Sequence, residues 1–246
     1  MKKDILNISE NNLKKYDLIH QNANNLVLKI EEKYKDVADR RTKDVEKRME
    51  KILKAFSSEK LGPHHFSSVS GYGHGDIGRE LIDKVFSKIF GAEKAAVRLQ
   101  FVSGTHAISS ALFGILRPGD NMLSVTGRPY DTLEEVIGLR GKGKGSLIEF
   151  GIQYDEISIL NEGEINFNQL EKVLKTPQRM VFIQRSCGYS WKKSLSIQNI
   201  QDICDFVHSK QPETVCFVDN CYGEFVEEKE PTEVGADLIA GSLIKN

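Results

Sequence analysis

Hydrophobic and polar positions divide the chain into a charged N-terminal part and a part with short apolar runs. Residues 9–60 are rich in lysine and glutamate and contain neither glycine nor proline, so we predict a helix of modest burial there. One apolar stripe on this helix has helical spacing, as expected for packing into a core or against another subunit. It consists of Val45, Met49, Ile52, Leu53 and Phe56. Residues 61–79 then interrupt the pattern with glycine, proline and small polar side chains.

From residue 80 onward, amphipathic helices alternate with short apolar segments. We expect a helix over residues 79–93, closed by Gly91, and a strand, a tight turn and a helix within residues 95–120. Further strands are expected at "NMLSVT", "SLIEFGI", "RMVFIQ", "TVCFVD" and "ADLIAGS", with helices at "NFNQLEKVLK" and "SIQNIQDICDFVHSK". This alternation predicts an α/β domain on a mainly parallel sheet, whose ligands bind beyond the carboxyl ends of the strands.

Charge and cysteine content narrow the classes of partner. The 34 lysine and arginine residues nearly balance the 35 aspartate and glutamate residues, so no field of one sign attracts nucleic acid or an anionic membrane. We expect a small-molecule ligand. The four cysteines form no C-x-x-C pair, which fits buried thiols in a reducing compartment. Since no run approaches the roughly 20 apolar residues of a membrane span and no signal core opens the chain, we expect a cytoplasmic protein.

Two of the expected strand ends carry candidate cofactor-binding groups. Ser103, Gly104 and Thr105 stand where a strand is expected to turn into a helix, and the free N–H groups of a helix start bind anions such as phosphate. Ser103 or Thr105 as a simple helix cap is the alternative. Asp219 ends the apolar run "TVCFVD", where a carboxylate needs a cation or a strong donor unless it is only a turn residue.

Two more candidates follow other strands. Lys245 comes three residues after Ser242 in "GSLIKN", where desolvation would lower the pKa of the amine and make it a better nucleophile. Tyr130 follows "NMLSVT" and could stack on a flat ligand. A solvated surface amine and a filler of the pocket rim are the structural alternatives for these two residues.

Together these groups match the needs of pyridoxal phosphate. That cofactor takes a lysine for its Schiff base, a carboxylate for its pyridine nitrogen, donors for its phosphate and a ring against its face. The sequence places one group of each kind at a strand end. For a metal, His64-His65 has no third ligand nearby, so we predict no metal site.

The segments "VDNCYGEF" and "EVGADLIAGSLIKN" resemble the aspartate-to-lysine region of fold type I pyridoxal-phosphate enzymes, in particular the cystathionine and methionine lyase group. Four further segments make the chain similar to bacterial methionine gamma-lyase-like or aluminium-resistance proteins. They are "SGYGHGDIGRELIDKVFSKIFGAE", "RLQFVSGTHAI", "GRPYDTLEEVIG" and "QRSCGYSW". The resemblance implies a helical segment and glycine-rich arm over residues 1–79 and a large cofactor-binding domain over residues 80–246.

The resemblance also implies a role for each candidate. Lys245 would form the Schiff base and move the proton of the substrate's α-carbon, while Asp219 would pair with the pyridinium nitrogen. The phosphate would be held by Ser103, Gly104, Thr105 and Ser242. Tyr130 would stack on the ring, and Tyr222 would donate toward the ring's phenolic oxygen.

The stretch "SGYGHGDIGRE" has three interpretations. Its G-x-G-x-x-G spacing is that of a dinucleotide-binding loop, but the polar segment before it is no convincing strand, which argues against NAD. In the cystathionine lyase group, a Tyr-x-Arg element of a neighbouring subunit reaches the cofactor phosphate, and Tyr72-x-His74 stands in the similar place. The histidine departs from that arginine, which leaves a substrate or proton-transfer role open. A connector that only needs glycine at positive φ is the third interpretation.

The predicted function is that of a carbon-sulfur lyase that acts on a sulfur-containing amino acid, as a homodimer or homotetramer with sites shared between subunits. The chain ends one residue after Lys245, so we expect a fragment that lacks the family's C-terminal domain and is poorly stable alone. Another fold type I reaction, such as that of an aldolase or transferase, and an inactive fragment that keeps only the oligomer interface are the alternatives.

Overall fold

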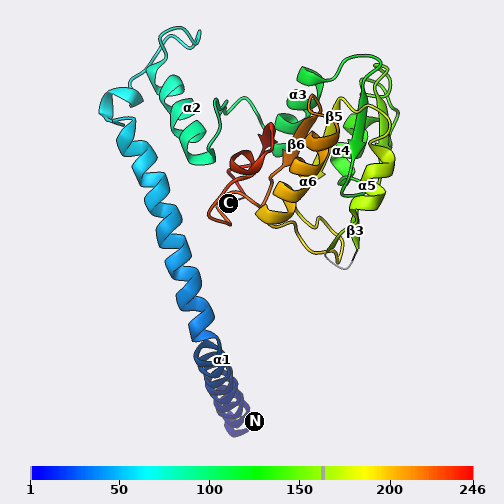
Figure 1. Cartoon of the computed structure of the whole chain (residues 1–246). Coiled ribbons are helices and arrows are strands. Elements are labelled where there is room, and N and C mark those ends of the chain that lie inside the picture. The colour runs from blue at the N-terminus through cyan, green and yellow to red at the C-terminus, as the bar shows by residue number, and fades with distance from the viewer. Residues whose placement is uncertain (1, 162–163, 246) are drawn as a thin grey trace. The chain divides into compact units, whose positions relative to one another are not determined.

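The computed structural model describes residues 2–161 and 164–245, with side chains from residue 19 onward except that of Asn161. Contacts divide the chain into two units, Met1–Glu50 and Lys51–Asn246. The helix α1 (Lys2–Ser58) runs through the first unit and continues into the second (Figure 1). Residues 51–79 therefore lie in the second unit, and the domain boundary expected after residue 79 stays a prediction.

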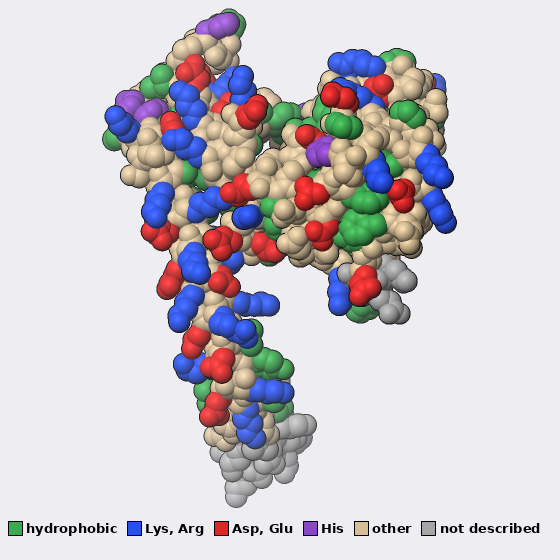
Figure 2. All heavy atoms as spheres, in the orientation of Figure 1, with side chains coloured by type: hydrophobic (Ala, Val, Ile, Leu, Met, Phe, Trp, Pro, Cys, Tyr) green, Lys and Arg blue, Asp and Glu red, His purple; other side chains and the backbone are tan. Residues whose placement is uncertain are grey.

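The first unit is a charged, exposed stretch of α1. Basic and acidic side chains alternate along its surface (Figure 2), and Lys35 and Asp39 form an ion pair one turn apart at 3.1 Å. Val45 and Met49 of the expected stripe are about half exposed, at 52% and 50%. The predicted helix is confirmed, whereas the contact of its stripe with another subunit stays a prediction.

The last turns of α1 begin the core of the second unit. Ala55 is buried there against α2 (Ile77–Phe90), whose apolar face consists of Leu81, Val85, Ile89 and Phe90. Asp76 caps α2 by accepting a hydrogen bond from the N–H of Arg79, and Gly91 ends the helix in the left-handed conformation at φ 61°. The helix predicted over residues 79–93 is confirmed.

A parallel sheet forms the centre of the second unit. Within the described residues it has five strands in the order β2-β1-β5-β6-β7, and every neighbouring pair is parallel. A short antiparallel hairpin of β3 and β4 lies outside it. The strands are β1 (Asn121–Ser124), β2 (Gln153–Glu156), β3 (Leu160–Asn161), β4 (Glu164–Ile165), β5 (Met180–Gln184), β6 (Val215–Asp219) and β7 (Leu238–Ala240). The predicted α/β class with a mainly parallel sheet is confirmed.

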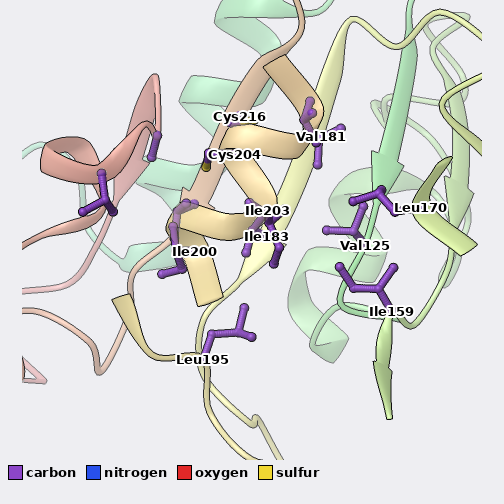
Figure 3. Close-up of a cluster of buried hydrophobic side chains, with 14 of the residues drawn as sticks. Val125, Ile159, Leu170, Val181, Ile183, Leu195, Ile200, Ile203, Cys204 and Cys216 are labelled. Carbon is purple, nitrogen blue, oxygen red and sulfur yellow. The ribbon is translucent and has the colours of Figure 1, made fainter. Parts of the chain in front are cut away.

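Helices pack on both faces of this sheet because the strand side chains alternate between two apolar cores. Val181 and Ile183 face one core with α5 (Phe167–Val173) and α6 (Ile197–Lys210), as Figure 3 shows. Met180 and Phe182 face the other core with α3 (Gly104–Ile115) and α4 (Asp131–Ile137). Two 3-10 turns complete the described elements, η1 (Pro63–Phe66) and η2 (Pro231–Val234).

Two expected strands are wrong. The apolar residues before Ser103 form no strand, and Leu99 and Val102 are 96% and 79% exposed. Residues 146–152 form turns that pack beneath α4, with backbone bonds from Leu147 to Val136 and from Ile148 to Ile137. The strand β2 begins only after Gly151, whose φ is 84°. Apolar side chains before Ser103 are thus exposed, whereas those of residues 146–152 pack against α4 instead of lining a sheet.

No helix among the described residues is long and apolar enough to cross a membrane.

Candidate functional site

Three neighbouring strands end in register at one edge of the sheet. Gln184 of β5 pairs with Asp219 of β6, and Asp219 pairs with Ala240 of β7. Ser242 and Lys245 follow β7 directly, so the aspartate-to-lysine region returns to the same edge. Parallel strands expose their carboxyl ends together, which makes this edge the place where a ligand binds in such folds.

Asp219 is a buried carboxylate at this edge, with 2% of its surface exposed. Burial raises the pKa of Asp219, while hydrogen bonds from Cys221 and the charge of Lys245 act to lower the pKa. The N–H of Cys221 donates to Oδ1 over 3.1 Å. A buried carboxylate of this kind suits a cation or a protonated ring nitrogen as its partner.

Lys245 lies near Asp219, but it is exposed, so the expected desolvation of this amine is wrong for the chain described here. Its Nζ stands 4.4 Å from the ring centre of Tyr222, a cation–π contact. Tyr222 is held in the left-handed conformation at φ 69° and is 59% exposed. The structure therefore brings Lys245, Tyr222 and Asp219 together, and their chemical roles stay predictions.

The first turn of α3 also faces this edge. Gly104 is buried, and a Cβ built on it would lie 3.0 Å from the Cys221 sulfur and 3.3 Å from Cβ of Ser242. The backbone at Gly104 thus approaches both loops that follow β6 and β7. Ser103 caps the helix by accepting a hydrogen bond from the N–H of His106 over 3.1 Å, so the capping interpretation is seen in the structure. Its hydroxyl hydrogen is still able to donate to an anion.

Tyr130 directly precedes α4, and its side chain extends to the first turn of α3. Its hydroxyl lies 3.2 Å from Oγ1 of Thr105, which in turn lies 3.2 Å from Oγ1 of Thr132. Burial raises the pKa of Tyr130 to about 12, an effect that the Thr105 hydrogen bond opposes and the charge of Asp219 reinforces. The phenol is therefore protonated at neutral pH, and the half-buried ring is held beside the start of α3.

Sequence reasoning missed Glu224, which fixes the loop after β7. Glu224 is 2% exposed, and its Oε1 accepts a hydrogen bond from the N–H of Ser242 over 2.6 Å. A Cβ on Gly241 would collide with the same carboxylate. Only a glycine allows this close approach, so Gly241 and Glu224 together set the position of Ser242.

Replacing Gly241 with alanine is expected to lower the free energy of unfolding by about 1–3 kcal/mol, because the new methyl group displaces a buried, hydrogen-bonded carboxylate. Gly114 offers a matched control in α3, since a Cβ there meets nothing within 4 Å. Alanine at Gly114 should stabilise the chain by about 0.5–1 kcal/mol. Urea denaturation of both variants measures the difference, and equal midpoints would contradict the tight approach at Gly241.

Sequence reasoning also missed Arg185, which follows β5 and is 3% exposed. Its guanidinium donates to Asn220 Oδ1, to the carbonyl of Gly223 and to Glu227 Oε1, each over 2.8 Å. These bonds order the loop that carries Tyr222 and Glu224. Their signal was available, because Arg185 and Asn220 come directly after expected strands.

The glycine-rich stretch before α2 is explained by backbone geometry. Gly71, Gly73 and Gly75 have φ values of 83°, 79° and 65°. A Cβ on Gly78 would lie 2.5 Å from the carbonyl oxygen of His65, so that glycine permits a close approach. A 3-10 turn and irregular chain precede it, and not the strand that a dinucleotide-binding loop needs.

Tyr72 and His74 are both exposed in this stretch, and the side chain of Tyr72 is 86% exposed. The structure of a single chain does not bring these two residues to the candidate site. Their delivery to a neighbouring subunit stays a prediction.

A separate group of possible metal ligands lies at the opposite ends of the strands. The side chains of His208, Cys216 and Asp237 offer ligand atoms within 4.8 Å of one another. Asp237 Oδ2 already accepts from the N–H of Cys216 over 2.8 Å and lies 3.0 Å from Nε2 of His208. These hydrogen bonds tie α6 to the starts of β6 and β7, and they use the backbone of Cys216 and not its thiol.

Comparison with known proteins identifies the family. A sequence profile of the family described as methionine gamma-lyase matches residues 21–246. The chain belongs to the methionine gamma-lyase family. Protein YnbB of Bacillus subtilis (strain 168) is 46% identical over 197 residues, which make up 80% of this chain and 47% of that protein. An L-methionine gamma-lyase of Fusobacterium nucleatum subsp. polymorphum is 25% identical over 77% of this chain and 44% of that enzyme.

Solved structures agree with this assignment. The chain resembles a carbon-sulfur lyase involved in aluminum resistance from Clostridium novyi NT, with 49% identity and a TM-score of 0.80 over 87% of this chain and 50% of that one. The pyridoxal-5'-phosphate dependent protein YhfS from Escherichia coli shares the fold, with 15% identity and a TM-score of 0.59. The resemblance and the fold type I class expected from the sequence are confirmed, and this member of the methionine gamma-lyase family spans about half the length of the relatives it matches.

The residues at the sheet edge fit the cofactor that the fold implies. The first turn of α3 offers backbone N–H donors beside Ser242, as a phosphate requires. The buried carboxylate of Asp219 suits a protonated ring nitrogen, and Lys245 is the amine nearby. One edge thus combines N–H donors, a buried carboxylate and an amine. A simple anion needs only the donors, whereas a phosphorylated aromatic aldehyde with a ring nitrogen uses all three groups.

Proposed function

We propose that this chain carries the cofactor-binding part of a pyridoxal-phosphate-dependent carbon-sulfur lyase that acts on a sulfur-containing amino acid. The observation that carries the proposal is the convergence of Asp219, Lys245 and the start of α3 at one sheet edge. Membership of the methionine gamma-lyase family supports the reaction class. The amino-acid substrate and a homo-oligomer with shared sites, including Tyr72 and His74, belong to the same proposal.

Pyridoxal phosphate supplies an electron-withdrawing ring that weakens the bonds at the substrate's α-carbon. Asp219 would hold the ring nitrogen protonated, and Lys245 would supply its Nζ as the point of attachment and as the base for the substrate's α-proton. The start of α3 with Ser103, Gly104, Thr105 and Ser242 would hold the phosphate. Tyr130, which is held by Thr105, would lie against the ring.

Cofactor addition and a product assay test this proposal in two stages. The purified chain should turn yellow with pyridoxal phosphate, and the full-length protein should release thiol and an α-keto acid from methionine, cystathionine or cysteine. A full-length protein that binds the cofactor but releases no thiol from any of them would favour another reaction class, such as that of an aldolase or transferase. Failure of the purified chain to bind pyridoxal phosphate would contradict the proposed cofactor site.

Replacing Asp219 with asparagine should weaken pyridoxal phosphate binding about hundredfold, because the ring nitrogen loses its anionic partner in a buried place. Since burial raises the pKa of Asp219, the carboxyl group is neutralised as the pH falls through that raised pKa. The affinity of the wild-type chain should therefore fall faster on acidification than that of the variant. Absorbance titrations at several pH values measure both, and parallel pH profiles would contradict the role of Asp219.

A further inference from the structure

The side chains of His208, Cys216 and Asp237 form a compact group at the amino ends of two neighbouring strands. Cys216 lies at the start of β6, Asp237 directly precedes β7, and His208 lies in the last turn of α6. Their ligand atoms all lie within 4.8 Å of one another, and no other three such side chains come this close within the described residues. Their separation along the chain forms no metal-binding motif, so the sequence predicts no such site.

The distances within this group fit a zinc ion at its centre. Tetrahedral zinc binds nitrogen, oxygen and sulfur at about 2.0–2.3 Å, which places the ligand atoms about 3.3–3.6 Å apart. Nε2 of His208 lies 3.0 Å from Oδ2 of Asp237, and every pair in the group lies within 4.8 Å. Side-chain rotations that move these atoms by about 1 Å therefore bring all three to zinc-binding distances.

The group is open to solvent on one side and anchored on the other. The side chains of His208 and Asp237 are 28% and 47% exposed, whereas Cys216 is fully buried. An ion can therefore reach the histidine and the aspartate from solvent and meet the sulfur of Cys216 at the base. The N–H of Cys216 donates to Oδ2 of Asp237 over 2.8 Å, and this bond orients the carboxylate as a supporting contact of a metal site does.

Each of the three side chains has an electron pair that zinc can use. A carboxylate oxygen accepts more than one bond, so Asp237 can keep its bond from the N–H of Cys216. His208 coordinates through Nε2 when its ring proton is on Nδ1, and coordination replaces the contacts of Nε2 with Asp237 and with the carbonyl of Thr214, 3.2 Å away. Cys216 binds as a thiolate, and its proton passes to solvent.

We propose that His208, Cys216 and Asp237 form a zinc-binding site whose fourth position is open to water. One nitrogen, one sulfur and one oxygen ligand suit zinc, whereas magnesium takes oxygen ligands. The ligands belong to α6, to β6 and to the residue before β7, so zinc links the end of α6 to two strands and stabilises the chain against unfolding. The candidate cofactor site lies at the carboxyl ends of these strands, so the two proposals are independent.

Cobalt(II), which replaces zinc in such sites, reports the ligands by absorbance. Co²⁺ added to the purified, reduced chain should give the visible bands of a tetrahedral ion and the near-ultraviolet band of a cobalt–thiolate bond. An equal amount of Zn²⁺ should remove both, whereas excess Mg²⁺ should not. Cys216→Ala should lose the thiolate band, and His208→Gln and Asp237→Asn should each raise the dissociation constant of Zn²⁺ about hundredfold or more.

Cys221→Ala is the matched control, because Cys221 is a buried thiol in the core on the other face of the sheet. It should keep both bands and the wild-type affinity for Zn²⁺. A wild-type chain without the tetrahedral bands, or a thiolate band that persists in Cys216→Ala, would overturn the proposal. His208→Gln and Asp237→Asn change partly exposed side chains, so unchanged Zn²⁺ affinity in both would overturn it even if Cys216→Ala fails to fold. Zinc binding without uptake of pyridoxal phosphate would contradict the proposed function alone.

Discussion

Replacing Lys245 with alanine is expected to abolish covalent capture of pyridoxal phosphate by this chain. Borohydride reduces a carbon–nitrogen double bond between an amine and an aldehyde, so the wild-type chain should gain the mass of one reduced cofactor. Without the amine at residue 245, no such bond forms at the site. In the full-length protein, the same change should lower the rate of thiol release about a thousandfold or more, since the residue acts as both attachment point and base.

Two further lysine variants separate this role from nonspecific labelling. Lys245→Arg keeps a positive charge near Asp219 but removes the nucleophilic amine, so it should also remain unlabelled. Lys193 is exposed, and Lys193→Ala should be labelled like the wild-type chain. Mass spectrometry of the intact protein and of its tryptic peptides locates the label. Full labelling of Lys245→Ala at another lysine would contradict the assignment of Lys245.

Replacing Arg185 with methionine is expected to lower the free energy of unfolding by about 3–5 kcal/mol. Its side chain is only 4% exposed, and the substitution leaves the amide oxygen of the fully buried Asn220 and the carbonyl of Gly223 without this donor. Methionine matches the arginine side chain only as far as Nε, so the loss combines the hydrogen bonds, the charge and the volume of the guanidinium end. Urea denaturation followed by circular dichroism measures it.

Arg140 provides the control for this measurement. Its ion pair with Asp131 spans 3.8 Å, and both side chains are more than half exposed, so Arg140→Ala should change the free energy of unfolding by less than about 1 kcal/mol. Arg185→Lys should recover part of the loss, because an ammonium group reaches only some of the acceptors. A loss at Arg185 no larger than that at Arg140 would show that the loop after β6 does not depend on the buried guanidinium.

The local sequence determined those helices and strands for which the hydrophobic periodicity and the residues at the element's ends predict the same structure. The apolar runs that end at Gln184 and Asp219 are strands, and Ser196 caps α6 where the sequence predicts a helix. The apolar runs before Ser103 and around Ile148 carry the same kind of signal, yet neither forms a strand. Periodicity records which side chains avoid water, and a turn packed beneath a helix buries apolar groups as well as a strand does.

The sequence alone determined the α/β class, the family and the positions of Asp219 and Ser242 at the ends of neighbouring strands, because parallel strands place their carboxyl ends at one edge whatever the packing details. The tertiary structure decided which groups surround those residues. Cys221 reaches the carboxylate of Asp219, Glu224 holds Ser242, and Arg185 orders the loop between β6 and β7. These contacts join residues brought together by the strand register and by glycines that permit close approach, and neither hydrophobic spacing nor composition carries that information.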